Sequence, residues 1–140
     1  MTERLYTTEI LRLAASLDAP QALEREDGRA ELRSPTCGSR ISLAVQLDDG
    51  RRVERLSMQV HACAFGQASA ALVERHSRGW THDEVSEAML TLSRWLASTH
   101  EDEGGWPGIS VLSPARTRKG RHGAILLPFR ALLAAIEAAR

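Results

Sequence analysis

Hydrophobic and polar residues follow two different periods along the chain, and the period changes near residue 30. Between Thr2 and Leu17 apolar residues recur every three or four positions, a spacing that predicts an amphipathic helix. Pro20 lacks a backbone N–H group and disfavours helical angles in the residue before it, so we expect the helix to end there. The first predicted element is therefore a helix over residues 2–17.

From residue 30 onward the apolar positions alternate with polar ones, which is the pattern of half-buried strands. Two alternating runs, 40–47 and 55–60, stand on either side of the sequence Asp-Asp-Gly at 48–50. An Asp-Gly step between two such runs predicts a hairpin, because both turn positions must tolerate positive φ. The run from Ala30 to Arg33 is expected to supply a neighbouring strand.

Helical spacing returns after residue 63. Thr81 and Glu84 form the sequence pattern of a capping box, in which the two side chains satisfy backbone N–H groups at the start of a helix. Pro128 is expected in the first turn of the last helix. The later elements that we expect are a helix over Ala64 to His76, a helix through Leu96 behind the capping box, a short helical or irregular segment at Ile109 to Ala115, a basic loop at Arg116 to Gly123 and a helix over Pro128 to Ala139.

The order of these elements predicts the fold class. A helix, then a strand cluster with a tight hairpin, then several helices indicate an α+β domain. One face of the small antiparallel sheet, of about three strands, is apolar and must be covered by helices packed on that face. The 140 residues, 43% of them hydrophobic, match a single globular domain over residues 1–140.

Charge and hydrophobicity argue against two classes of partner. The 18 Lys and Arg residues equal the 18 Asp and Glu residues, whereas nucleic-acid binding needs a surplus of positive charge on one face. No stretch approaches the roughly 20 apolar residues that cross a bilayer, and the first residues lack the basic-then-apolar order of a secretory signal. We expect a soluble, cytoplasmic protein that binds neither nucleic acid nor membrane.

The candidate chemistry rests on two cysteines. Cys37 lies in a turn between two predicted strands, and Cys63 directly follows a strand and precedes a helix. A helix N-terminus favours the thiolate, which is the form that binds metal or accepts sulfur. One hairpin separates the two cysteines, and its up-and-down path can return the chain to the same end of the sheet. Two interpretations stay open: a shared Cys37/Cys63 site, or two isolated cysteines that are small buried hydrophobes.

Two histidines are candidates for a further ligand. His61 stands two residues before Cys63, and His122 lies on a Gly-flanked basic loop; each taken alone is also compatible with a surface residue. Zinc takes four ligands and iron–sulfur clusters are usually held by cysteine thiolates, so two cysteines supply half of a set. The sequence has no G-x-S-x-G, HExxH, CxxC or Gly-rich phosphate loop, and we expect no enzymatic activity.

Around both cysteines the sequence resembles the IscU/SufU type of iron–sulfur cluster assembly scaffold, equivalent to the N-terminal domain of NifU-like proteins. The resemblance covers most of the chain in order. It rests on residues 28–30 and 34–38, the turn at 48–50, the run Cys-Ala-Phe-Gly-Gln-Ala-Ser-Ala at 63–70, and residues 113–116 and 126–132. It implies a sheet of about three antiparallel strands covered by helices.

The resemblance also implies a ligand set. In that family three cysteines and an aspartate hold zinc or a nascent cluster, which passes to apo-proteins after a desulfurase donates sulfur. Cys37 matches the first cysteine and Cys63 the second. Ser39 stands where the aspartate is usual, and Ala124 stands where the third cysteine would be. His122, two residues before Ala124, could bring its imidazole into the vacated place.

The first hypothesis is therefore a cluster assembly scaffold that binds iron or a transient [2Fe–2S] cluster through Cys37 and Cys63, with His122 as a third ligand. The partners that the resemblance implies are a cysteine desulfurase or sulfur-transfer protein and apo iron–sulfur proteins. A second hypothesis is a degenerate scaffold fold that holds no cluster and acts by protein contacts. A third is a domain in which the same residues hold a structural zinc ion.

Overall fold

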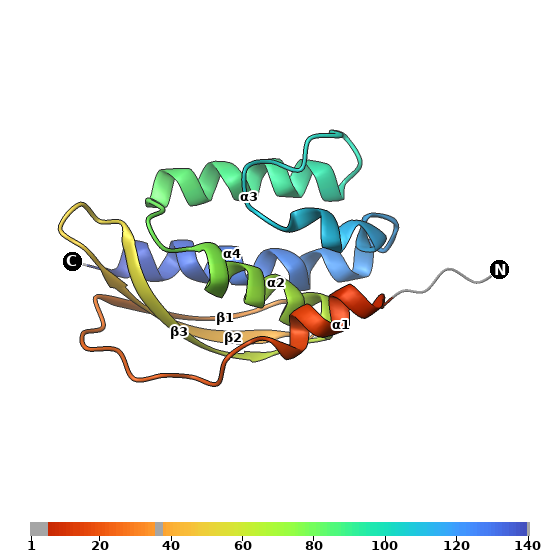
Figure 1. Ribbon diagram of the computed structural model, residues 1–140. Helices are drawn as coiled ribbons and strands as arrows, with labels where there is room; N and C mark the ends of the chain where they lie inside the picture. The colour runs from red at the N-terminus through yellow and green to blue at the C-terminus, as the bar shows by residue number, and fades with distance from the viewer. Residues whose placement is uncertain (1–5, 36–37, 140) are drawn as a thin grey trace.

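In the part of the chain that it describes, residues 6–35 and 38–139, the computed structural model has a three-stranded antiparallel sheet with helices packed on one face (Figure 1). The strands are β1 (Gly28–Arg33), β2 (Arg40–Leu47) and β3 (Val53–His61), paired in the order β1–β2–β3. The helices are α1 (Thr8–Ala15), α2 (Ala64–His76), α3 (His82–Leu96) and α4 (His122–Ala138), with the 3-10 helices η1 (Ile109–Thr117) and η2 (Lys119–Arg121). The predicted α+β fold class is confirmed.

The helices form an inner and an outer layer on the sheet (Figure 1). In the inner layer α4 contacts β1 and β2, α2 contacts β3 and α4, and α1 packs on α2. In the outer layer α3 packs on α4 and η1. Ile41, Leu43 and Val45 of β2 are at most 3% exposed and belong to the hydrophobic core, so the apolar face predicted from their alternation is the face that the helices cover. Within the described residues no helix combines the length and apolar character of a membrane span.

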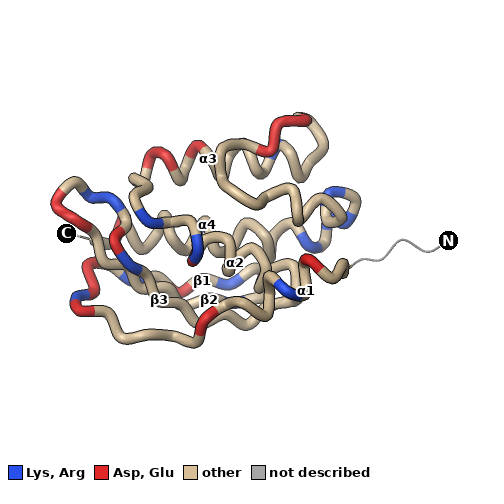
Figure 2. Tube along the Cα trace, viewed as in Figure 1, with Lys and Arg blue, Asp and Glu red and all other residues tan. Residues whose placement is uncertain are grey.

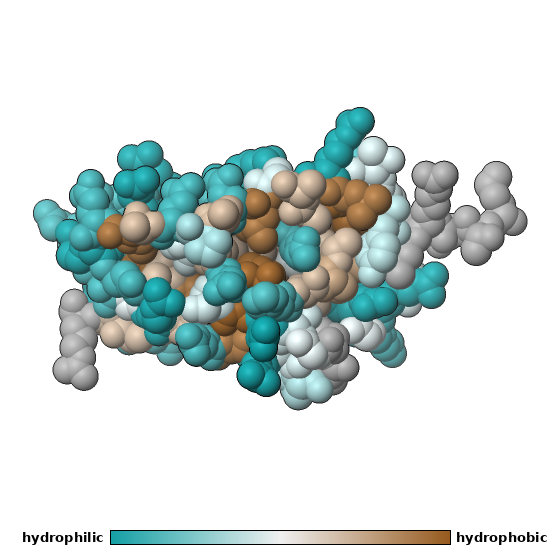
Figure 3. Space-filling view, turned by 90° about the horizontal axis from the view of Figure 1, so that it is seen from below, coloured by the Kyte–Doolittle hydropathy of each residue, from teal (hydrophilic) through white to brown (hydrophobic). Residues whose placement is uncertain are grey.

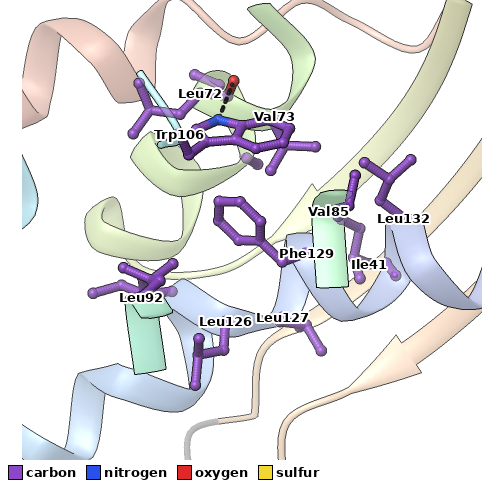
Figure 4. Packing of buried hydrophobic residues seen from close by; sticks show 14 of the residues in the cluster. Ile41, Leu72, Val73, Val85, Leu92, Trp106, Leu126, Leu127, Phe129 and Leu132 are labelled. Atoms are coloured by element: carbon purple, nitrogen blue, oxygen red, sulfur yellow. Dashed lines mark hydrogen bonds between the residues drawn. The ribbon is translucent and has the colours of Figure 1, made fainter. Parts of the chain in front are cut away.

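Aromatic side chains join the two helical layers (Figure 4). The Trp106 ring lies 4.5 Å from that of Trp80 and packs edge-on against Phe129 at 5.0 Å, measured between ring centroids. The indole Nε1 of Trp106 donates a hydrogen bond to the carbonyl oxygen of Leu72 at 3.1 Å. Trp106, which lies in the connection between α3 and η1, therefore contacts both α2 and α4.

The last helix begins at His122, so the predicted start at Pro128 is wrong. Pro128 lies inside α4, where it has no N–H group to donate to the carbonyl of Ala124. Residues 124–129 are all buried, because α4 runs between the sheet and the helices α2 and α3. This burial outweighs the missing hydrogen bond. The predicted basic loop at 116–123 is also wrong, since it contains the end of η1, all of η2 and the start of α4.

The first helix is shorter than predicted, and the predicted hairpin has a different turn. Thr7 caps α1, its hydroxyl accepting the N–H of Ile10 at 3.1 Å, so the helix begins at Thr8. In the β2–β3 turn the positive φ, 60°, falls on Arg51 and not on the glycine of the Asp-Gly step. The carboxylate of Asp48 accepts the N–H groups at positions 50 and 52, both at 2.9 Å, and so stabilises a wider turn.

The predicted capping box is present at the start of α3. The Thr81 hydroxyl accepts the N–H of Glu84 at 3.3 Å, and the Glu84 carboxylate accepts the N–H of Thr81 at 2.9 Å. Hydrogen bonds from the backbone N–H and then the hydroxyl of Thr81 lower the pKa of Glu84, and Arg52 adds to this. The contribution of the carboxylate to stability is therefore complete above the ordinary pKa of 4.5 and is lost as the pH falls through the lower folded value.

We expect Thr81→Ala to lower the free energy of unfolding at pH 7 by about 1 kcal/mol, as measured by urea denaturation. The difference from wild type should narrow in acid, because protonation of Glu84 weakens its bonds to Thr81 in the wild type as well. Thr117→Ala, at an exposed threonine that ends η1, is the control and should change stability by less than about 0.5 kcal/mol. Equal losses in the two variants would show that the capping box does not stabilise α3.

Candidate functional site

Five chain segments meet at one end of the molecule. β1 ends there, β2 begins and β3 ends there, and both α2 and α4 begin there, at the right of Figure 1. The up-and-down path of the hairpin produces this arrangement, as the sequence predicts. The loop from β1 to β2 contains Cys37, which lies outside the described residues, as does Thr36.

Cys63 occupies the N-cap position of α2. Its backbone is extended, with φ −66° and ψ 173°, and its side chain makes no capping hydrogen bond. The thiol is partly buried against the core. Gln67 holds the turn from strand to helix, since its side chain donates to the carbonyl of Ala62 at 3.1 Å and its N–H donates to that of Cys63 at 2.9 Å. The thiol therefore stands at a helix start whose first-turn N–H groups receive no hydrogen bond from it.

The starts of α2 and α4 lie against each other. A Cβ atom on Gly66 would lie 3.3 Å from the Cβ of Ala124, and the Ser69 hydroxyl donates to the carbonyl of Ile125 at 2.6 Å. Ala124 is 1% exposed in this interface. Its side chain is thus enclosed between the two helices, which is where the resemblance places a third cysteine.

His122 is held in a defined orientation at the first position of α4. Its Nε2 lies 2.7 Å from the carbonyl oxygen of Ala115 in η1. A carbonyl oxygen only accepts, so Nε2 carries the hydrogen, and Nδ1 of the neutral ring carries the lone pair. No described residue forms a hydrogen bond with Nδ1. Histidines that bind metals are usually held in this way, by a carbonyl or carboxylate on the other ring nitrogen.

His61 does not share a face with Cys63, and Ser39 is buried. β3 ends at His61, whose exposed side chain lies on the face of the sheet away from the helices, whereas Cys63 packs against the core. The strand does not continue through Cys63, so the two residues do not share a face. Ser39 is 3% exposed, and its carbonyl accepts the N–H of Ser34 at 2.8 Å. Among residues 6–35 and 38–139, no three His, Cys, Asp or Glu side chains gather as a metal site.

The basic residues of the predicted loop at 116–123 differ in their roles: one packs against α3, whereas others are exposed. Arg116 donates to the carbonyl of Trp95 at 2.9 Å and lies 5.0 Å above that indole ring, so it holds η1 against α3. Arg118 and Lys119 are exposed, at the end of the molecule where α4 begins (Figure 2). The sequence did not predict that the carbonyl of Ala115 orients His122, because any residue type has a backbone carbonyl.

Comparison with solved structures decides the family. The N-terminal domain of a nitrogen-fixing NifU-like protein from Brucella abortus is 30% identical, with a TM-score of 0.87 over 96% of this chain and 93% of that one. This chain belongs to the NifU-like family. The NifU-like domain also has the fold of a protein from Fervidobacterium islandicum AW-1 that is assigned as an iron–sulfur cluster assembly scaffold for the SUF system. That structure is 22% identical, with a TM-score of 0.83 over 94% of this chain and 96% of the other. No protein-family model and no curated protein matches the sequence.

These two structural matches confirm the resemblance that the sequence motifs indicate. The NifU-like domain has a scaffold-like fold. The match extends over 96% of the chain and is not limited to one motif. The ligand set within that fold stays a prediction.

Proposed function

We propose that this NifU-like domain is an iron–sulfur cluster assembly scaffold that holds iron or a nascent [2Fe–2S] cluster and passes it on. The observation that carries the proposal is the position of Cys63, whose thiol stands at an uncapped helix N-terminus. Membership of the NifU-like family supports the same function, as does the scaffold assigned in the SUF system with the same fold.

The chemistry of the donor set suits this cargo. Thiolates of Cys63 and Cys37 are soft ligands that bind iron and sulfide-bridged clusters. The N–H groups of the first turn of α2 offset the negative charge that a thiolate-bound cluster carries. Nδ1 of His122 supplies a third ligand, oriented by the carbonyl of Ala115.

A set of three protein ligands leaves one of the usual four positions to an external thiol. A cluster held in this way exchanges readily, which is what a scaffold requires. The domain itself catalyses no reaction in this proposal. A cysteine desulfurase or sulfur-transfer protein supplies sulfur, and apo iron–sulfur proteins receive the finished cluster.

Anaerobic reconstitution with ferric iron, sulfide and a small thiol tests the proposal. The wild type is expected to gain iron and sulfide in equal amounts, together with a thiolate-to-iron absorption band. Cys63→Ser and Cys37→Ser should each reduce bound iron at least about tenfold, because a hydroxyl is a poor ligand for a soft metal. His122→Gln should weaken iron binding less than either cysteine variant. His100→Gln, at an exposed histidine, is the control and should match the wild type.

Two outcomes would replace this proposal with one of the other hypotheses. A protein that stays colourless and free of metal would indicate a scaffold fold that acts by contacts alone. Stoichiometric zinc, with a melting temperature that collapses when the zinc is chelated, would indicate a structural metal site.

A further inference from the structure

A row of basic side chains crosses the sheet on the face away from the helices, at the same end as Cys63. Arg33 ends β1, Arg40 begins β2 and His61 ends β3, and the strand register places the three directly opposite one another. All three are exposed and line a hollow of about 530 Å³. Ser42 and Gln59 form the next row of the same hollow. Figure 3 looks onto this face and shows hydrophilic side chains over much of it.

The basic side chains of the row form no ion pair with a described residue. Glu31 is the carboxylate that lines the hollow, and within the described residues no ion pair joins any acidic group to Arg33, Arg40 or His61. Directly opposed residues of neighbouring strands have Cβ atoms about 5 Å apart, and like charges at that distance destabilise a sheet. Two adjacent guanidinium groups are therefore better accommodated when an anion covers them.

The rest of this sheet face is already occupied by the chain itself. The connection from α1 to β1 passes under the strands (Figure 1) and bonds to them, the N–H of Gln21 donating to the Ser57 hydroxyl at 2.7 Å and the N–H of Arg25 to the Gln46 side chain at 3.4 Å. Arg29, two rows nearer this connection, forms an ion pair with Glu26 at 2.9 Å. The connection thus leaves uncovered the end of the face that holds Arg33, Arg40 and His61.

We propose that this row, Arg33, Arg40 and His61, is a docking surface for an acidic, extended segment of a partner protein. Two strand spacings of about 4.8 Å each separate the outer members of the row, so it spans roughly 10 Å. Carboxylates at alternate positions of an extended segment lie about 7 Å apart and can meet both ends of such a row. A single phosphate is too small to do so. The groups are exposed, so the contact is a salt-sensitive surface interaction.

Docking at this row places the partner at the end of the sheet where β3 leads into Cys63 and where β1 and β2 join the loop that contains Cys37. Arg33 and Arg40 flank the loop that contains Cys37, and His61 is two residues from Cys63. The consequence, that the partner exchanges sulfur, iron or a cluster there, rests on the proposed function. The binding itself does not.

Calorimetric titration of the metal-free domain with an acetylated decaglutamate peptide tests the docking surface. We expect binding at low salt that weakens on going from 20 to 150 mM salt. The double variant Arg33→Glu/Arg40→Glu should bind at least about tenfold more weakly, because it reverses the charge of the row. Arg55→Glu is a control for position, with one charge reversal instead of two, since Arg55 is exposed on the same sheet face but lines a different hollow, with Asp18, Glu54 and Glu74. Its affinity should change less than about twofold, and both variants should keep the wild-type melting temperature within a few degrees.

Three results would overturn the proposal. The first is an absence of peptide binding by the wild type at low salt. The second is an equal loss of affinity in Arg55→Glu, which would show attraction to overall charge. The third is pyrophosphate binding that depends on Arg33 and Arg40 while the peptide does not bind, which would make the row a phosphate site. Cys63→Ser should bind the peptide as the wild type does, so failure of the proposed cluster site leaves this test unaffected.

Discussion

Gly28→Ala is expected to destabilise the domain by roughly 3 kcal/mol or more, at the upper end of what overpacking costs. Gly28 begins β1 where the strand passes beneath the end of α4. A Cβ atom at this position would overlap the carbonyl oxygen of Ala135 and would lie 2.9 Å from the backbone nitrogen of Ala139. Both neighbours are backbone atoms of α4 or its cap, so the helix itself must move away from the sheet.

Urea denaturation and thermal melting of Gly28→Ala measure this effect. Such a loss is a large part of the 5–15 kcal/mol that stabilises a typical domain, so the melting temperature should fall by about 10 °C. Gly105→Ala is the control, because a Cβ atom there meets nothing within 4 Å. A Gly28→Ala protein as stable as that control would mean that α4 does not lie against β1 as described.

Trp106→Ala is expected to lower the free energy of unfolding by about 3–5 kcal/mol. The indole is 2% exposed and packs against Trp80 and Phe129, so its removal leaves a cavity between the two helical layers. It also leaves the carbonyl of Leu72 without the hydrogen bond from Nε1. Because Trp106 precedes η1, the variant should also loosen the segment that orients His122.

Trp106→Phe separates the two contributions. It keeps an aromatic ring but removes the N–H donor, so a smaller loss of about 1–3 kcal/mol is expected by urea denaturation. Iron binding by Trp106→Phe should stay close to that of the wild type. An alanine variant no less stable than the phenylalanine variant would contradict the packing of this cluster.

Local patterns were sufficient for much of the fold. The alternation in 40–47 and 55–60 and the turn between them predict the hairpin, because a strand pair joined by a short turn depends on neighbouring residues. Thr81 and Glu84 likewise predict the start of α3, since a capping box lies within one helical turn. The strand-to-helix junction also placed Cys63 at a helix start, where the structure has it.

The start of α4 shows where local reasoning fails. Pro128 has the residue type of a first-turn position, and residues 122–127 have no periodicity that distinguishes a helix from a buried loop. The helix forms there because α2 and the sheet enclose residues from Ala124 onward. Neither of these neighbours is visible from the proline and its flanking residues.

The sequence alone determined the α+β class, the order of the strands along the chain and the end of the sheet toward which Cys63 is carried, because each follows from periods and turns within short stretches. Only the tertiary structure decided the orientation of His122 by Ala115, the placement of His61 on the opposite face from Cys63 and the alignment of Arg33 with Arg40 and His61. These features depend on strand register and on contacts between η1, α2 and α4, which join residues distant in sequence and are set by packing of the whole core.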